Sequence, residues 1–527
     1  MPSLDVLVVG GGHNALTAAA YLARSGLRVA VFERRPIVGG AVCTESDLLP
    51  GYRVDVGSAL HILIHLTPIV RELELARYGL VYVDVDPIAW QPLEDGGGFG
   101  IYRDLEQTLE SLHAVSPPDA EAWRAFVREW EGFARRLFSV FQRPPTLLHM
   151  MGGFGGRVPP GRQVRELLTP YGNFIRARFK HPAVQAALGW LSAQSGPPPS
   201  EPGSGGFLAW LPILHRFGAR RAVGGSGALS VALARCIEAH GGEIYVGARV
   251  IRVERVDGRA RRVVLEDGRT FEGECVLSGT HILETIDLVG AEAFPAPLRR
   301  QFAGLRVGNG FGMMHRFATR ELPAYAGAPP EATHGMQLLC PSLEYVDAAY
   351  LDYATGRPSR APCVIAMSFT SVDPSLAPPG KHLVYLWGQY FPYERSDGRS
   401  WDPEASAEAA ASLEEVLFRY APNLRGKIEG RLTQTPLDFE QRLGLRRGNV
   451  MHLEMGIDQM FALRPTPGLS DYRTPVPGLF LTGASTHPGG GVFGASGRSA
   501  ARVILKALEG SRVGRARRWL AQQMGRP

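Results

Sequence analysis

The sequence of 527 residues is poor in lysine, in cysteine and in long apolar runs. Only four of its 57 basic residues are lysine, and none of these lies in a glycine-flanked segment of the kind that holds a cofactor. Five cysteines without a Cys-x-x-Cys pair predict neither a disulfide framework nor a metal site. No apolar run reaches the ~18 to 20 residues that a membrane-spanning helix needs. The chain opens on an apolar strand without a charged leader, so we expect a cytoplasmic protein.

Charge also excludes a class of partner. A net charge of +6 is modest for this length, and no basic stretch has interleaved aromatic residues, so we expect no nucleic-acid binding. The most basic stretch, residues 512–526, is either a solvated tail or a segment that lies on an anionic membrane surface. Hydrophobic residues make up 45% of the chain, which predicts a globular protein with a core large enough for two lobes.

The amino-terminal segment VVGGGHNALTAAAYLA has the order of a dinucleotide site: a strand over 4–9, a glycine turn and a helix over 14–23. Gly10 permits the tight turn, and Gly12 lets the backbone approach a pyrophosphate. Position 15 must be small where the helix packs on the strand, and Ala15 meets that need. The helix dipole then favours a bound phosphate.

A second strand over 28–32 ends in Glu33, near the offset of ~20 residues expected of a ribose ligand. The carboxylate argues against a 2′-phosphate. Directly after it, PIVGGA places Gly39, Gly40 and Ala41 in a second glycine turn, which resembles the extended FAD fingerprint of the glutathione-reductase-like flavoproteins. FAD is therefore favoured over NAD, although this turn alone is also compatible with a surface loop.

The carboxy-terminal part repeats the same logic, with a strand over 478–482, a loop with four glycines over 483–491 and a helix from Ser496. A second helix amino terminus can therefore face the cofactor. Thr486 and His487 are among the few polar residues of this loop. We expect both to lie near the isoalloxazine edge, with His487 holding the loop rather than transferring a proton.

The segments between the two ends predict a discontinuous α/β fold. We expect a glutathione-reductase-like FAD-binding Rossmann domain over 1–95, 222–290 and 442–527, interleaved with an α+β substrate-binding lobe over 96–221 and 291–441. A linker rich in proline and glycine runs over residues 143–162. The Gly224–Gly227 turn opens a helix, but it is too compressed, and too weakly preceded by a strand, for an NAD(P)H site.

The chain resembles the phytoene-desaturase-like flavoproteins, and among them most closely the FAD-dependent CrtO-type β-carotene ketolases. Both terminal segments carry the superfamily resemblance, and the ketolase-like segments are AQSGPPPS, RVGNGFGM, SVDPSLAPP and RGNVMHLEMGIDQMF. Ala15 and Ala41 are departures, because many relatives have glycine at the first position and many desaturases have arginine at the second.

The resemblance implies a flavoprotein that removes a hydride from an apolar polyene, with a β-ionone-ring 4-ketolase as the favoured activity. A carotenoid desaturase is the alternative, and an amine oxidase or a non-catalytic carotenoid carrier is a weaker one. It implies a peripheral position on the inner face of the cell membrane and quinone or oxygen as electron acceptor. The predicted cofactor contacts are Gly10, Gly12, Asn14, Ala15, Glu33, Arg34, Gly39, Gly40, Ala41, Val250, Gly483, Thr486, His487, Gly490, Gly491 and Val492.

His452 and Glu454 are the candidate catalytic residues, because strand alternation puts both side chains on one face. The alternative is a buried histidine beside a glutamate that pairs with an arginine such as Arg464. His61 and His65 stand at i and i+4 of an expected helix and would suit a metal, but no third ligand is evident, which favours packing near the flavin.

An apolar substrate needs an apolar wall. The helix expected over 118–141 carries apolar residues at helical spacing, which indicates core packing or, as the alternative, a membrane-facing entrance. Aromatic candidates for the wall are Phe207, Trp210, Phe311, Phe317, Trp387, Tyr390, Phe391 and Phe461.

Overall fold

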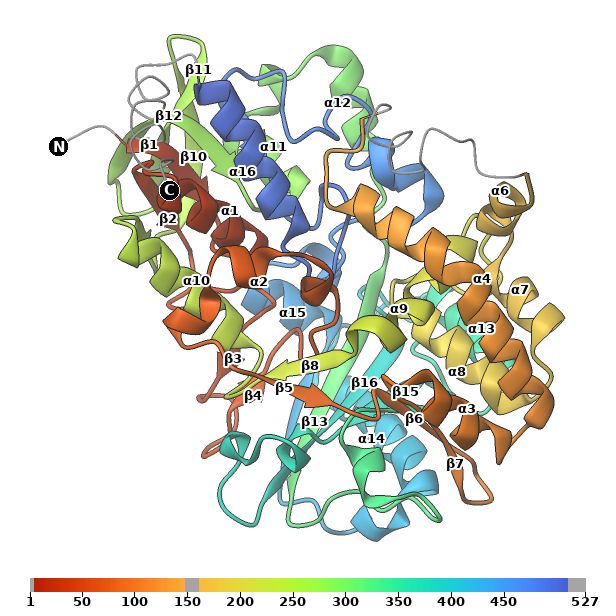
Figure 1. Ribbon diagram of the computed structural model, residues 1–527. Coiled ribbons are helices and arrows are strands. Elements are labelled where there is room, and N and C mark those ends of the chain that lie inside the picture. Colours follow the sequence, from red (N-terminus) through yellow and green to blue (C-terminus); the bar gives the residue numbers. More distant parts are fainter. Residues whose placement is uncertain (1–3, 147–160, 510–527) are drawn as a thin grey trace, which may run out of the picture.

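In a computed structural model, which describes residues 4–146 and 161–509, the chain forms two seven-stranded sheets (Figure 1). The first sheet has the order β10-β11-β12-β1-β2-β9, and β18 pairs with β12 beside this path. Its strands are β1 (Leu4–Val9), β2 (Val29–Phe32), β9 (Glu243–Tyr245), β10 (Val250–Val256), β11 (Arg259–Leu265), β12 (Thr270–Ser278) and β18 (Leu479–Leu481).

The β1 strand lies at the centre of this sheet. It runs parallel to β2 and to β12, and its residue Val8 is fully buried and pairs with Val31 on one side and Leu277 on the other. A strand with a continuous apolar run, here Val6–Val9, is typical of a parallel sheet covered on both faces. The strand predicted from LDVLVV has the observed bounds.

Three helices cover one face of this sheet and join the two ends of the chain. They are α1 (His13–Arg24), α10 (Gly227–Ala239) and α16 (Ala495–Leu508), and α1 packs against both others. The contact between α1 and α16 requires glycine, because a Cβ at Gly497 would lie 2.0 Å from the carbonyl oxygen of Asn14. The predicted meeting of the two termini is confirmed.

The second sheet has the order β17-β13-β16-β15-β14-β6-β7. Its β6 strand lies within the span 1–95 that the sequence assigned to the nucleotide-binding part, although the larger division into lobes stays a prediction. The strands are β6 (Ala89–Pro92), β7 (Gly98–Ile101), β13 (Gly310–Thr319), β14 (Met336–Leu339), β15 (Val364–Met367), β16 (His382–Pro392) and β17 (Gly430–Gln434).

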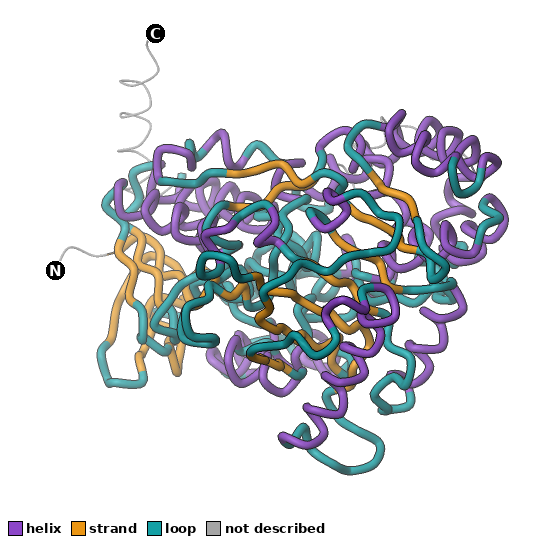
Figure 2. Tube along the Cα trace, turned by 90° about the horizontal axis from the view of Figure 1, so that it is seen from below, coloured by secondary structure: helices purple, strands orange, loops and turns teal. Residues whose placement is uncertain are grey.

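Helices gather around the second sheet, at the end of the molecule opposite the β10–β12 meander (Figures 1 and 2). The longest is α4 (Pro117–Phe141), whose Trp123, Phe126 and Trp130 are at most 3% exposed. Core packing of this apolar face is therefore confirmed, and its alternative as a membrane-facing entrance is wrong. The other helices are α3 (Leu105–His113), α6 (Gly161–Leu168), α7 (Tyr171–Arg178), α8 (Pro182–Ala193), α9 (Leu211–Phe217), α13 (Leu343–Ala354) and α14 (Pro403–Tyr420).

Short elements connect the two sheets. The strand β8 (Ala219–Ala222) precedes the Gly224–Gly227 turn, where the sequence shows only a weak strand signal. It pairs antiparallel with β5 (Tyr82–Val85) rather than joining the parallel sheet. The remaining helices are α2 (Ile69–Glu72), α11 (Ile282–Val289), α12 (Ala296–Ala303) and α15 (Pro436–Leu443), and the strands β3 (Thr44–Glu45) and β4 (Val54–Asp55) form a two-stranded sheet.

Within the described residues, no helix is both long and apolar enough to span a bilayer. Most of the predicted linker (residues 147–160) and the basic stretch over 512–526 lie outside the described residues.

Candidate cofactor site and active site

A cavity of about 890 Å³ lies where the two ends of the chain meet the second sheet. Its wall includes Gly10 and Gly12 from the amino-terminal turn, Gly490 and Gly491 from the carboxy-terminal loop, and Tyr385 from β16. This volume is at the upper end of the range of about 300 to 1,000 Å³ found for ligand pockets. The cavity therefore suits a large ligand that contacts both ends of the chain.

Two helices begin at or near this cavity. The α1 helix begins after Gly12, which lines the cavity, and the α16 helix begins after Gly494, next to the lining residue Phe493. In the described part of the chain no side chain caps either helix. The uncapped N–H groups carry partial positive charge and are suited to phosphate oxygens. A Cβ on Gly12 would meet no protein atom within 4 Å, so the backbone there is left open to a ligand.

Glu33 is held in position at the end of β2. Its carboxylate is 6% exposed, and it accepts hydrogen bonds from the N–H of Gly11 at 2.7 Å and of Arg35 at 2.8 Å. A carboxylate has further lone pairs, so two ribose hydroxyls can still donate to it. Uncapped helix ends, an open glycine turn and a fixed ribose acceptor together fit a dinucleotide such as FAD.

The structure brings most of the predicted cofactor residues into this wall. The residues in place are Gly10, Gly12, Asn14, Ala15, Glu33, Arg34, Gly39, Gly40, Ala41, Val250, Gly483, Gly490, Gly491 and Val492. Their roles toward the cofactor stay a prediction.

Thr486 and His487 are placed elsewhere. The described residues that line the cavity do not include them, which departs from the expectation of a position at the ring edge. The Thr486 hydroxyl donates to the Gly483 carbonyl at 2.8 Å and lies 2.7 Å from the Ser496 hydroxyl. The His487 Nε2 lies 3.2 Å from the carbonyl of Val140. Both side chains therefore stabilise the loop through hydrogen bonds to other parts of the protein and do not line the cavity.

His13 is a cavity residue that was not predicted from the sequence. It begins α1, and its Nε2 lies 3.2 Å from the carbonyl of Gly491, so it links the two glycine segments directly. Burial lowers the pKa of His13 to about 4, and the imidazole is therefore neutral at neutral pH. Its position directly after the Gly10-x-Gly12 turn was the available signal.

The two candidate catalytic residues are separated. Residues 449–456 form no strand, and His452 has a φ of 62°, so the alternation that joined it to Glu454 is wrong. His452 lines the cavity, whereas the Glu454 carboxylate faces outward and accepts from Arg306 Nε at 2.7 Å. Arg464, named as an alternative partner of Glu454, contacts its backbone carbonyl instead.

His452 is part of a cluster with two other side chains. Its Nδ1 lies 2.9 Å from the Ser485 hydroxyl, and the ring of His281 stacks on it at 5.1 Å between centroids. Burial, with the nearby charges of His281 and Arg464, lowers the pKa of His452 well below its ordinary value. A neutral imidazole at the cavity wall is able to accept a proton.

His61 and His65 do not share a helix. His61 forms an isolated bridge with Arg220, and His65 lies in a short 3-10 turn. Among the described residues, no group of three or more metal-ligating side chains comes together. Packing of the two histidines near the flavin stays a prediction.

The wall beyond the glycine segments is largely apolar. Of the aromatic candidates, Phe317 and Phe391 pack in the core of the second sheet, Tyr390 lines a small neighbouring pocket, and the side chain of Phe311 lies outside the described part of the structure. The candidates that line the cavity are Phe207, Trp210, Trp387 and Phe461.

Comparison with known proteins agrees with this geometry. A family model described as an NAD(P)-binding Rossmann-like domain matches residues 8–73. The rat protein called pyridine nucleotide-disulfide oxidoreductase domain-containing protein 2 is 32% identical, over 96% of this chain and 94% of its own length.

Two further relatives have named activities. A limonene dehydrogenase component of Castellaniella defragrans is 27% identical over 96% of this chain and 95% of its own. A lycopene-forming phytoene desaturase of a Paracoccus species is 24% identical over 95% of this chain and 97% of its own.

A solved structure supports the fold. Cyclohexylamine oxidase of Brevibacterium oxydans superposes with a TM-score of 0.59 at 17% identity, over 96% of this chain and all of its own. At this identity the likeness is one of fold alone.

Proposed function

We propose that this protein oxidises an apolar polyene, with β-carotene 4-ketolase activity as the favoured form. The chain belongs to the family of flavin-dependent oxidoreductases that includes the rat protein, and its cofactor is FAD. The observation that carries this proposal is one continuous cavity in which a dinucleotide cradle meets an apolar and aromatic wall. Two relatives named for isoprenoid hydrocarbons, limonene and phytoene, support an apolar substrate.

When bound, FAD would accept a hydride, which carries the two electrons of the oxidation. The protein residues then have three tasks. The glycine segments and Glu33 hold the dinucleotide, and the apolar wall orients the polyene and excludes water. His452 presents a neutral imidazole at the wall, and we assign it the proton that the substrate loses for each hydride removed.

The apolar wall also reaches the surface. Ile457 lines the cavity and is 46% exposed, which gives an insoluble substrate an apolar rim to cross. This supports the further proposal of a peripheral membrane position. We also propose quinone or oxygen as electron acceptor.

An amine oxidase remains the weaker alternative. All four lysines lie in the described residues, and none lines the cavity, so the lysine expected near the flavin of such an enzyme is missing.

A carotenoid desaturase is the second candidate, favoured by the phytoene desaturase relative. Product analysis separates the two. The chain is expressed in cells that make β-carotene, and the carotenoids are examined by mass spectrometry. A ketone gains one oxygen and loses two hydrogens, whereas a desaturated product only loses two hydrogens. Label from heavy-oxygen water in the ketone supports hydride removal followed by water addition, and label from dioxygen contradicts that route. Unchanged carotenoids contradict the proposal.

A further inference from the structure

Four buried or half-buried side chains form an unbroken hydrogen-bonded chain that ends at the cavity. The Tyr82 hydroxyl lies 2.8 Å from His61 Nδ1, and His61 Nε2 lies 2.8 Å from the Ser226 hydroxyl. The Ser226 hydroxyl lies 2.5 Å from the hydroxyl of Ser58, and Ser58 lines the cavity. Each of these groups is able both to donate and to accept a hydrogen bond.

The four residues come from separate segments of the chain. Tyr82 lies on β5, His61 and Ser58 follow β4, and Ser226 occupies the turn between β8 and α10. Neither His61 nor Ser226 is exposed. A polar chain in such surroundings is costly unless every member has a partner, and when all are paired the bonds strengthen one another.

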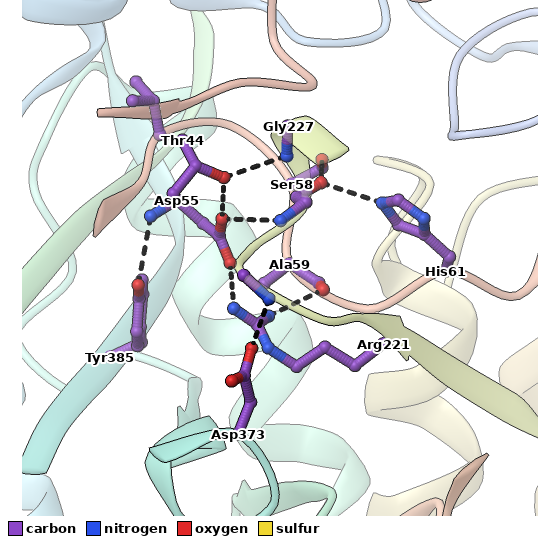
Figure 3. Close-up of polar contacts among 12 residues, drawn as sticks. Thr44, Asp55, Ser58, Ala59, His61, Arg221, Gly227, Asp373 and Tyr385 are labelled. Atoms are coloured by element: carbon purple, nitrogen blue, oxygen red, sulfur yellow. Dashed lines mark hydrogen bonds and ion pairs between the residues drawn. The ribbon is translucent and has the colours of Figure 1, made fainter. Parts of the chain in front are cut away.

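A buried ion pair fixes the segment that carries Ser58 (Figure 3). Asp55 pairs with Arg221 at 2.6 Å and accepts from the backbone N–H of Ser226 at 2.8 Å. Arg221 also donates to the carbonyl of Ala59 at 2.9 Å. Both charged side chains are at most 1% exposed, so Ser58 and Ser226 are held on one rigid support.

The protonation state of His61 gives the chain its direction. Burial, with the charges of His65 and Arg221 nearby, lowers the pKa of His61 well below its ordinary value, so the ring carries one proton. If Tyr82 donates to Nδ1, that proton is on Nε2 and is donated to Ser226, and Ser226 donates to Ser58. Every hydrogen in the chain then has an acceptor except that of Ser58, which is free for a ligand in the cavity.

We propose that Tyr82, His61 and Ser226 form a relay that presents the Ser58 hydroxyl as a polarised hydrogen-bond donor to an acceptor oxygen or nitrogen in the cavity. Two ligands offer such an acceptor. One is the flavin ring, because Gly57, the neighbour of Ser58, packs against Ala41 of the second glycine turn. The other is an oxygen atom on the substrate, and only this second source rests on the proposed function.

The test uses the FAD-loaded full chain with Ser58→Ala and Tyr82→Phe. One arm records the absorption spectrum and the reduction potential of the bound flavin without substrate. The other arm measures the dissociation constants of β-carotene and of its 4-hydroxy and 4-keto derivatives. If Ser58 donates to the flavin, Ser58→Ala shifts the spectrum and the reduction potential. If Ser58 donates to the substrate, Ser58→Ala leaves both unchanged. It then lowers the preference for the oxygenated carotenoids over β-carotene about tenfold, the size expected of one hydrogen bond.

Tyr82→Phe tests the relay itself, because it removes only the first donor of the chain and leaves Ser58 in place. It should shift the same readout in the same direction by a smaller amount, about threefold in the substrate arm. Tyr325→Phe is the matched control, since Tyr325 is a buried tyrosine whose hydroxyl donates to Gln337 at 3.2 Å away from this chain.

Three outcomes are informative. A change in either arm by Ser58→Ala and Tyr82→Phe, but not by Tyr325→Phe, supports the relay. No change in either arm, or a change in Ser58→Ala that Tyr82→Phe does not share, overturns it. If no carotenoid binds the unaltered protein, the proposed function fails while the flavin arm still tests the relay.

Discussion

The buried guanidinium of Arg464 donates to the backbone carbonyl of Ala484 through Nε at 3.0 Å and Nη2 at 2.7 Å. The same side chain donates to the carbonyls of Met451 at 2.6 Å and Gln459 at 3.0 Å. Within the described residues no carboxylate contacts it, and the acceptors of its hydrogen bonds are backbone carbonyls. One cation therefore joins the carboxy-terminal glycine loop to the segment that carries His452.

Replacing this cation should loosen both segments. Arg464→Gln is expected to lower the free energy of unfolding by about 3 kcal/mol, because several buried carbonyls lose their donor. Urea titration measures the change. Arg473→Gln is the control, since its side chain is 45% exposed, and a change within about 0.5 kcal/mol is expected there. Equal effects in the two variants would contradict the role of Arg464.

A substitution at Gly12 should affect cofactor binding without affecting folding, because the space beside this residue is open. Gly12 has a φ of −67°, which alanine adopts readily, and an added Cβ would meet no protein atom within 4 Å. Gly12→Ala should leave the melting temperature of the cofactor-free chain unchanged and weaken FAD binding by at least about tenfold, because the methyl group occupies the path of the pyrophosphate. Gly132→Ala, in α4, should leave FAD binding unchanged and raise the melting temperature slightly, because alanine is the better helix former and the added Cβ has room. Tight FAD binding by Gly12→Ala would show that the dinucleotide lies elsewhere.

Glu33 offers a second, chemically different test of the same site. Glu33→Gln keeps the shape of the side chain and removes the charge that holds two backbone N–H groups and the ribose. We expect about a tenfold loss of FAD affinity, measured by fluorescence quenching of the added flavin. Glu415→Gln, on an exposed glutamate paired with Arg425 at 2.8 Å, serves as control. Unaltered affinity in Glu33→Gln would remove this residue from the site.

The two candidate catalytic residues should now differ in effect. His452→Asn keeps a residue that tolerates a positive φ and removes the base, and turnover should fall by about a hundredfold with the flavin colour retained. Glu454→Gln should change turnover by less than about twofold, because its carboxylate pairs with Arg306 outside the cavity. The opposite ranking would reinstate Glu454 and remove His452.

Buried histidines predict acid sensitivity. Burial lowers the pKa of His13, His281 and His487 from 6.5 to about 4. The unfolded chain therefore binds more protons below pH 6.5, and the stability that these groups contribute is present above pH 6.5 and lost as the pH falls toward 4. The melting temperature should drop between pH 7.5 and pH 5. His281→Asn keeps an acceptor for the N–H of Leu283 and should show a smaller drop. An identical drop would exclude His281 from the effect.

The cofactor half of the fold was predictable because its signals are local. The strand over Leu4–Val9, the helix ending at Leu508 and the glycine turns between them follow from apolar runs and from backbone needs that few residues other than glycine meet.

The segment that carries the two candidate catalytic residues was not predictable by the same means. Around Glu454 the sequence alternates as a strand does, but its backbone N–H donates to the carbonyl of Arg306, and neighbouring carbonyls accept from Arg464 instead of a second strand. Those partners are remote in sequence. The hydrogen bonds of His61 to Ser226 and Tyr82 were not predictable either, because they form only when β5 and β8 are paired.

One experiment tests most directly the claim on which the other conclusions depend, namely that both ends of the chain enclose FAD. The full chain is purified, its absorption spectrum is recorded, and the flavin released on denaturation is quantified against protein. We predict a yellow protein with equimolar FAD, whose melting temperature falls when the flavin is removed and recovers when it is returned. A colourless protein whose melting temperature does not respond to added FAD would contradict the account.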